Sequence, residues 1–327
     1  MLELIRQFQP ACVLAAAADL DLFDALTPQP LTAPAVARKL AADVRGLTVL
    51  LDALVALQLL HKRNLRYAVP RLVAKVLTRD GKSSVLAMAQ HQANCLRRWA
   101  QLARVVKTGR RADCVPSVRG FAGDMKAFIG AMDNISVPVA DEVIKPLKKI
   151  PFRRLLDVGG ASGTWTMALL RARTQALAIL FDLPDVIPLA RRRLAVGGFI
   201  KRVQLVPGDF MHDPLPGGAD LVWISAIMHQ NSRAQNRTLL TKVFRALEPG
   251  GRIAIRDIIM ASNRTAPVAG ALFAINMLVG TNGGSTFTFD EVREDLMSAG
   301  FIYVQIVRLD EGMHSIVVAR KPGENNK

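Results

Sequence analysis

Long hydrophobic runs are missing from the sequence. No apolar stretch reaches the roughly 18 residues that a membrane-spanning helix needs. The nearest are residues 11–18 and 269–280, and Asn276 interrupts the second. The N-terminus carries Glu3 and Arg6 ahead of its short apolar run, and no A-x-A cleavage site follows at the distance typical of a secretory signal. We therefore expect a protein with neither a membrane span nor a secretory leader.

Cysteine is scarce. The 327-residue chain has three cysteines, widely spaced and without a C-x-x-C pair or an adjacent histidine cluster. That pattern excludes a disulfide scaffold and indicates neither a metal site nor a catalytic thiol. Reduced thiols are typical of the cytoplasm, and a cytoplasmic location is expected. The three residues are Cys12, Cys95 and Cys114.

Acidic residues are outnumbered. Lys and Arg together number 43 against 27 Asp and Glu, which gives a net charge of +16. Both halves of the chain share this excess, and there is no separate basic tail. Such a surface attracts nucleic acid or anionic ligands, but it is more often simply solvated, so nucleic-acid binding is not the expected main function. The apolar fraction of 50% and the length predict a globular protein of about two domains.

Residues 1–82 have the pattern of a winged-helix domain. Helices are expected over residues 11–26, 33–41 and 44–60, and the basic, alternating piece 62–69 follows as a short hairpin. In a repressor the second and third of these helices would contact DNA. The same shape also serves as an oligomerisation module, so the fold leaves both functions open.

The rest of the chain divides into a helical connecting segment, residues 83–150, and an α/β part, residues 151–327. Helices are expected over 85–106 and 125–147 of the connecting segment. In the α/β part short apolar strands alternate with helical segments, which predicts a doubly wound, Rossmann-like sheet of seven strands. Strands are expected at 155–158, 177–181, 203–206, 221–225, 253–259, 302–309 and 315–320, the last two as an antiparallel hairpin. Helices are expected at 164–173, 185–196, 233–247, 267–279 and 289–299.

The first of these strands runs into a glycine-rich turn, with Asp157 at the strand end and Gly159, Gly160 and Gly163 behind it. The spacing fits a dinucleotide fingerprint poorly. A carboxylate here suits a cationic ligand, because it would repel a pyrophosphate. An α-amino group and a sulfonium are both cationic. The pattern D-x-G-x-x-x-G resembles motif I of class I S-adenosylmethionine-dependent methyltransferases.

Two further acids follow successive strands. Asp182, next to Leu183, closes the second strand, where a carboxylate can accept hydrogen bonds from ribose hydroxyls. Asp209 follows the third strand and can hold the exocyclic amine of adenine, while Phe210 can cover the ring face. Three acids at successive strand ends support the S-adenosyl-L-methionine site that this resemblance implies.

These motifs together resemble the plant-type O-methyltransferase family, which includes caffeate, isoflavone and acetylserotonin O-methyltransferases. The resemblance rests on Phe181-Asp-Leu-Pro-Asp-Val, Pro207-Gly-Asp-Phe, the His229 segment and Leu247-Glu-Pro-Gly-Gly-Arg, and it includes residues 10–26. It implies a homodimer whose N-terminal helices interlock and help to wall the partner's substrate pocket. In that case the winged helix binds protein and not DNA.

The same resemblance implies that His229 is the general base and that Asp257, at the end of the fifth strand, orients it. A neutral imidazole suits proton removal near pH 7. The chain departs from the family pattern directly after His229, where Gln230 and Asn231 stand in place of the usual Asp-Trp, and at two further positions. Ser225 stands where the family often has Lys or Arg near the adenosine, and Thr286 stands where a second flanking Glu is expected. Ser225 is still expected to line the cofactor.

The predicted reaction is methylation of a hydroxyl group on a small aromatic acceptor. A C- or N-methyltransferase that works by positioning alone is the alternative, and a winged-helix regulator with a vestigial cofactor domain is a further one. The apolar insertion at 267–279 predicts either a lid over the acceptor or a packing surface. The expected pocket residues are Phe128, Met132, Asn276 and Met277.

Overall fold

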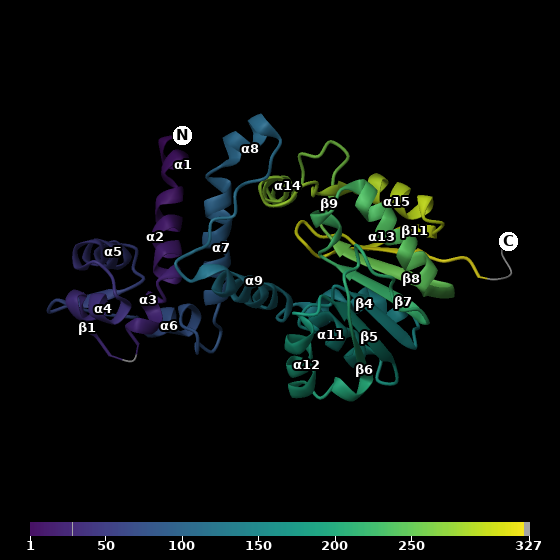
Figure 1. Cartoon of the computed structure of the whole chain (residues 1–327), viewed down its shortest axis with the longest axis horizontal. Coiled ribbons are helices and arrows are strands. Elements are labelled where there is room, and N and C mark those ends of the chain that lie inside the picture. The colour runs from purple at the N-terminus through teal and green to yellow at the C-terminus, as the bar shows by residue number, and fades with distance from the viewer. Residues whose placement is uncertain (28, 324–327) are drawn as a thin grey trace. The chain divides into compact units, whose positions relative to one another are not determined.

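The computed structural model describes residues 1–27 and 29–323 and divides the chain into two compact units (Figure 1). The first unit comprises residues 1–102 and 113–135, and the second comprises residues 103–112 and the chain from 136 onward. Residues 324–327 of the expected α/β part lie outside this description. Within the described ranges no helix is long and apolar enough to cross a membrane.

The first unit contains the expected helices and hairpin of a winged-helix domain. Its three short strands pair antiparallel in the order β1-β3-β2, with Leu31 opposite Tyr67 and His61 opposite Ala68. The elements are α1 (Leu2–Arg6), α2 (Phe8–Asp19), α3 (Leu22–Ala25), β1 (Leu31–Thr32), α4 (Ala33–Leu40), α5 (Val44–Ala56), β2 (His61–Arg63), β3 (Arg66–Ala68), α6 (Arg71–Leu77), α7 (Leu86–Trp99) and α9 (Gly120–Ser136).

Three expected helices were wrong in their extent. The helix over 11–26 is interrupted at Asp21, whose φ of +49° lies in the left-handed region that aspartate tolerates better than most residues. The helix over 85–106 ends at Trp99, where the Gln101 side chain exchanges hydrogen bonds of 3.0 and 3.1 Å with the Asp113 backbone. The helix over 125–147 ends at Ser136 because Pro138 disfavours helical backbone in the residue before it.

The second unit is built on a seven-stranded sheet in the order β11-β12-β8-β7-β4-β5-β6 (Figure 1). All pairs between β8 and β6 are parallel, and β12 runs antiparallel to both of its neighbours, as the expected hairpin requires. The strands are β4 (Arg154–Val158), β5 (Leu177–Asp182), β6 (Val203–Pro207), β7 (Ala219–Ser225), β8 (Leu247–Asp257), β11 (Ile302–Arg308) and β12 (Ser315–Arg320), with a separate parallel pair β9 (Ile259–Met260) and β10 (Phe287–Thr288). The expected Rossmann-like sheet is confirmed.

Helices cover both faces of this sheet, which is why its strands are almost wholly apolar. One buried cluster joins Leu180 and Trp223 to α11 and α12, and the other joins Ile179 and Phe181 to α13 and α15. The helices are α8 (Leu102–Thr108), α10 (Ala140–Val143), α11 (Thr164–Ala172), α12 (Ile187–Val196), α13 (Arg233–Ala246), α14 (Val268–Gly280) and α15 (Phe289–Ser298), with short 3-10 turns η1 (Lys145–Lys149), η2 (Ile200–Arg202) and η3 (Met228–Gln230).

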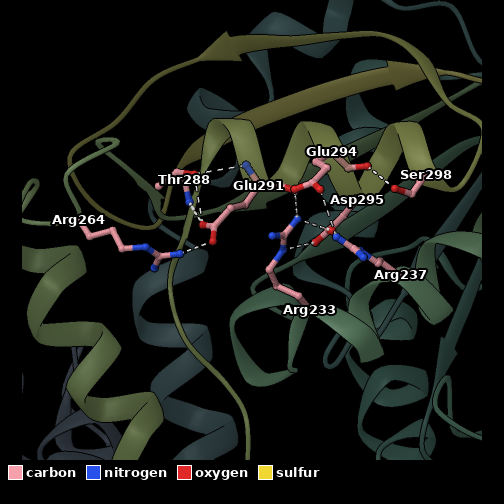
Figure 2. A network of polar contacts seen from close by, with 8 residues as sticks. All are labelled: Arg233, Arg237, Arg264, Thr288, Glu291, Glu294, Asp295 and Ser298. Carbon is pink, nitrogen blue, oxygen red and sulfur yellow. Dashed lines mark hydrogen bonds and ion pairs between the residues drawn. The ribbon is translucent and has the colours of Figure 1, made fainter.

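A polar network fastens α13 to α15 (Figure 2). Asp295 is 2% exposed and accepts hydrogen bonds from Arg233 Nη2 at 2.7 Å and from Arg237 Nε at 2.6 Å. Arg233 also donates to Glu294, whose side chain is largely exposed. The buried carboxylate therefore has two positively charged partners, the arrangement that buried charges need.

Candidate active site

The turn behind β4 is shaped so that only glycine fits at two positions. Gly159 has a φ of +68°, and a Cβ there would collide with Ile227. A Cβ on Gly160 would lie 2.6 Å from Leu180 Cγ. Gly163, with a φ of +83°, is the N-cap of α11 directly after the turn. The glycines thus let this turn, the glycine cradle, pack closely against Ile227 and Leu180 at the carboxyl edge of the sheet, where ligands of open α/β folds bind.

Asp157 lies beneath this cradle and is 1% exposed. Its Oδ2 accepts a hydrogen bond of 2.5 Å from Thr166 Oγ1 on α11. Burial raises the pKa of this carboxyl to about 7, against the opposing effect of the Thr166 bond, and the nearby charge of Asp182 raises it further. A cationic ligand beside this carboxyl would lower its pKa and favour the ionised form.

Asp182 ends β5 beside the glycine-rich turn. Its two carboxylate oxygens accept hydrogen bonds of 2.7 Å from the backbone N–H groups of Ala161 and Leu183. Burial raises the pKa of this carboxyl, and the two backbone bonds oppose that shift. Each oxygen keeps a further lone pair, so the carboxylate can still accept ribose hydroxyls.

Asp209 and Phe210 follow β6, whose last residue lies beside Asp182 in the sheet. Asp209 Oδ1 accepts from the N–H of Met211 at 2.8 Å, which fixes the turn and leaves the side chain 37% exposed. Phe210 is half-buried. The cradle, the buried acid and the acids at the next two strand ends fit the amino-acid, ribose and adenine parts of S-adenosylmethionine.

Ser225 ends β7 and has a partner that the sequence did not indicate. Its Oγ accepts a hydrogen bond of 2.8 Å from Nε of Arg256, which lies directly opposite on β8. A cation therefore lies beside position 225, on the neighbouring strand. The strand register was the signal that could have found it, since cross-strand neighbours point to the same face.

The centre of the candidate site is the pair of His229 on η3 and Asp257 at the end of β8. His229 Nδ1 lies 2.8 Å from Asp257 Oδ1, and both side chains are 7% exposed. The backbone N–H groups of His229 and Ile258 donate to the same carboxylate at 3.3 and 2.9 Å. In the tautomer that donates from Nδ1 to Asp257, the lone pair of Nε2 is available to a substrate.

The segment between α14 and β10 supports His229 from behind. Ser285 donates its N–H to the His229 carbonyl at 2.9 Å, and a Cβ on Gly284 would collide with that carbonyl. Thr286 is 2% exposed, and its carbonyl accepts from Arg264 Nη1 at 3.1 Å. Arg264 also pairs with Glu291, whose carboxylate closes the N-terminal cap of α15 (Figure 2). Position 286 thus belongs to a braced loop.

Helix α14 covers the imidazole of His229. Phe273 stands edge-on to the ring, with the centroids 4.8 Å apart. Met277, one helical turn further on, is 8% exposed, and Asn276 is half-buried. Sequence reasoning missed Phe273, although its spacing of four residues from Met277 places both on one helix face.

Two other expected pocket residues belong to the first unit. Phe128 and Met132 both lie on α9, and Phe128 packs against His91 with the ring centroids 5.2 Å apart. Their assignment to the acceptor pocket stays a prediction.

Two family models match the chain. The family model of the O-methyltransferase domain matches residues 101–302, and that of the O-methyltransferase dimerisation domain matches residues 2–79. The chain is 31% identical to a 3-hydroxy-5-methyl-1-naphthoate 3-O-methyltransferase of Streptomyces sahachiroi, over 94% of this chain and 91% of the relative. It is 28% identical to the N,N-dimethyltransferase OxyT of Streptomyces rimosus, over 98% and 96%.

Solved structures give the same result. Human N-acetylserotonin methyltransferase, solved in complex with SAM, superposes with a TM-score of 0.79 at 27% identity, and the match covers 98% of this chain and 96% of that one. The chain therefore belongs to the O-methyltransferase family and is an S-adenosylmethionine-dependent methyltransferase with an N-terminal dimerisation domain.

Proposed function

We propose that the protein methylates a hydroxyl group of a small aromatic acceptor, with His229 as the general base. The observation that carries this proposal is the buried His229–Asp257 pair at the carboxyl edge of the sheet. S-adenosylmethionine, when bound, supplies a methyl group on a sulfonium that leaves as a neutral thioether. The task left to the chain is to align the acceptor and remove its hydroxyl proton, for which Nε2 of His229 is suited.

We propose the following cofactor contacts. Asp157 faces the cationic methionine part over the cradle of Gly159, Gly160 and Gly163. Asp182 holds the ribose, with Leu183 beside it. Asp209 and Phe210 hold the adenine. Support comes from their placement at the ends of β4, β5 and β6, since these are adjacent parallel strands that end at one edge of the sheet.

An aromatic acceptor is supported by two observations. Phe273 stands edge-on to the imidazole, and Met277, four residues later, lies on the same side of α14; aromatic edges and methionine both contact flat rings favourably. Relatives of the chain are named for a naphthoate and for acetylserotonin as acceptors. Asn276, half-buried on the same helix, is proposed as the polar contact that orients the acceptor.

The test is a panel of phenols, hydroxyindoles, hydroxynaphthoates and matched aryl amines, incubated with the enzyme and S-adenosylmethionine. A mass gain of one methyl on a hydroxylated member, located on oxygen by NMR, is the expected result. N-methylation is the second candidate, because OxyT, named as an N,N-dimethyltransferase, aligns over nearly the whole chain. Methylation of the amines with no reaction of any hydroxyl would replace the proposal by that candidate.

We further propose that the active form is a homodimer that is assembled through the N-terminal domain, which binds its second copy and not nucleic acid. Large apolar side chains are exposed on α1 and α2, among them Leu4 at 61%, Ile5 at 61% and Phe8 at 55%. Contiguous apolar exposure of this kind marks interaction surfaces. Light scattering should give about twice 35.6 kDa, and a fully active monomer would contradict the proposal. A cytoplasmic location is also proposed, on the support of three free cysteines.

A further inference from the structure

Arg256 is a fully buried cation at the edge of the cofactor site. It is the last residue but one of β8 and is 2% exposed. Its Nε donates to Ser225 at 2.8 Å, and Nη1 donates to the Met313 carbonyl at 3.0 Å and lies 3.3 Å from His314 Nδ1. The guanidinium carbon lies 4.4 Å from the centroid of the Trp165 ring, so the group is stacked and held in one orientation.

These contacts include no carboxylate. Among the residues that the structure describes, no Asp or Glu oxygen lies within 4.0 Å of the Arg256 guanidinium. The buried charge between α13 and α15 is built differently, since Asp295 there contacts two arginines. Burial lowers the pKa of Arg256 to about 10, against the opposing effect of the charges of Asp257 and Asp310, which leaves it charged near neutral pH. A buried cation that contacts no anion directly is costly, and an anionic ligand in contact with it would stabilise it further.

The strand register shows which charged side chains share a face of the sheet with Arg256. Cross-strand register pairs Asp157 with Trp223 and Ser225 with Arg256, so these side chains share one face of the sheet. That face is covered by α11, whose Trp165 contacts Arg256 and whose next residue contacts Asp157. An acid and a cation thus lie on either side of the first turn of α11, immediately behind the glycine cradle. An α-amino acid group carries the matching pair of charges.

We propose that Arg256 is the receptor for a ligand carboxylate at this edge of the sheet, with Ser225 and Trp165 as the residues that position it. The carboxylate of the methionine part of S-adenosylmethionine is the source that the placement favours, because Asp157 lies on the same face. An acceptor carboxylate is the second source, and this arm rests on the proposed function. Arginine suits either one, because its planar fork binds carboxylates through two hydrogen bonds.

The test is a comparison of ligand pairs that differ only in the carboxylate. Binding of S-adenosylhomocysteine and of its decarboxylated analogue is measured by calorimetry for the wild type and for Arg256→Met, which keeps an unbranched apolar stem. We expect Arg256→Met to weaken S-adenosylhomocysteine by roughly 10- to 100-fold and to leave the decarboxylated analogue unchanged. Arg245→Met, at an exposed position of α13, is the matched control and should change neither affinity.

A second pair distinguishes the sources. Binding of 3-hydroxy-1-naphthoate and of its primary amide is measured on the complex with S-adenosylhomocysteine. Selective loss of the naphthoate, with cofactor affinity unchanged, assigns Arg256 to the acceptor and also supports a carboxylate receptor. Equal losses for both members of both pairs, or no loss at all, would overturn the inference and make Arg256 a packing residue.

The ligand pairs distinguish lost carboxylate binding from a general loosening of the fold. Each comparison is made between two ligands of the same variant, so a general loosening lowers both affinities together. If Arg256→Met does not fold, Arg256→Lys keeps the charge and loses the paired hydrogen bonds, and it should weaken the carboxylate ligand alone, by less. All readouts are binding measurements, so they hold whichever atom of the acceptor receives the methyl group.

Discussion

Two buried charge sites in the second unit use the same side-chain types to different ends. Between α13 and α15, Asp295 is enclosed by Arg233 and Arg237 and has its charge balanced within the chain (Figure 2). At the carboxyl edge of the sheet, Asp157 and Arg256 are just as deeply buried, but Asp157 has a hydroxyl partner and Arg256 has hydroxyl, carbonyl and imidazole partners. In the first site opposite charges are in contact, and in the second Asp157 and Arg256 each contact uncharged partners.

The difference teaches where to look for function in this fold. A buried ion pair holds two helices together, and removal of one partner is expected to appear as lost stability. A buried charge that contacts no opposite charge and lies next to the glycine cradle can be stabilised by a ligand. Removal of that side chain is expected to appear as lost affinity.

The largest stability effect is expected at Asp295. Asp295→Ala should lower the free energy of unfolding by roughly 3 kcal/mol, the low end for a broken buried pair, because both arginines reach solvent. Urea unfolding measures this. Glu294→Ala is the control, since Glu294 contacts the same Arg233 but its side chain is 62% exposed, and it should cost less than about 1 kcal/mol. Equal losses for the two variants would remove the distinction between the sites.

The largest affinity effect is expected at Asp182. Asp182→Ala removes the proposed ribose contact and should weaken S-adenosylhomocysteine by roughly 5- to 150-fold, equivalent to about 1–3 kcal/mol. Asp185→Ala, exposed three residues later, should leave the affinity unchanged. Calorimetry gives both numbers. An Asp182→Ala protein that binds as tightly as the wild type would mean that the ribose lies elsewhere.

A pH effect is expected from Asp157. Its pKa of about 7 in the free protein means that the carboxyl is protonated below that pH and must lose the proton to bind a cation. Affinity for S-adenosylmethionine should therefore fall as pH falls, by about tenfold per unit below pH about 7. Titration of the ligand's own groups affects the wild type and Asp157→Asn alike, so Asp157→Asn is the control. Its affinity should depend less steeply on pH. Parallel profiles for the two proteins would argue against a contact between Asp157 and the cationic part.

The smallest effect is expected for the stability of Arg256→Met. Because Arg256 has no carboxylate partner, its replacement should change the free energy of unfolding by about 1 kcal/mol or less. Urea unfolding beside Asp295→Ala compares the two sites directly. A loss as large as that of Asp295→Ala would show that Arg256 is part of the structural framework.

Much of this arrangement was predictable from the sequence for identifiable reasons. Strands buried on both faces have short apolar sequences, which made the sheet predictable. The expected strand order placed His229 and Asp257 at the ends of neighbouring strands, which made their contact predictable. The contact of Arg256 with Ser225 depends on register across two strands 31 residues apart in sequence, which periodicity does not report. The contact of Phe273 with His229 depends on the packing of α14. The break at Asp21 depends on one left-handed residue, which propensity alone did not indicate.

The most direct test of the proposed function is single-turnover methyl transfer by His229→Ala at saturating S-adenosylmethionine, with the acceptor identified by the panel. We expect a rate lower by roughly 10²- to 10⁴-fold, a smaller loss for Asp257→Asn, and a cofactor affinity close to that of the wild type for both. A His229→Ala enzyme that keeps more than about a tenth of the wild-type rate would contradict general-base O-methylation by this residue.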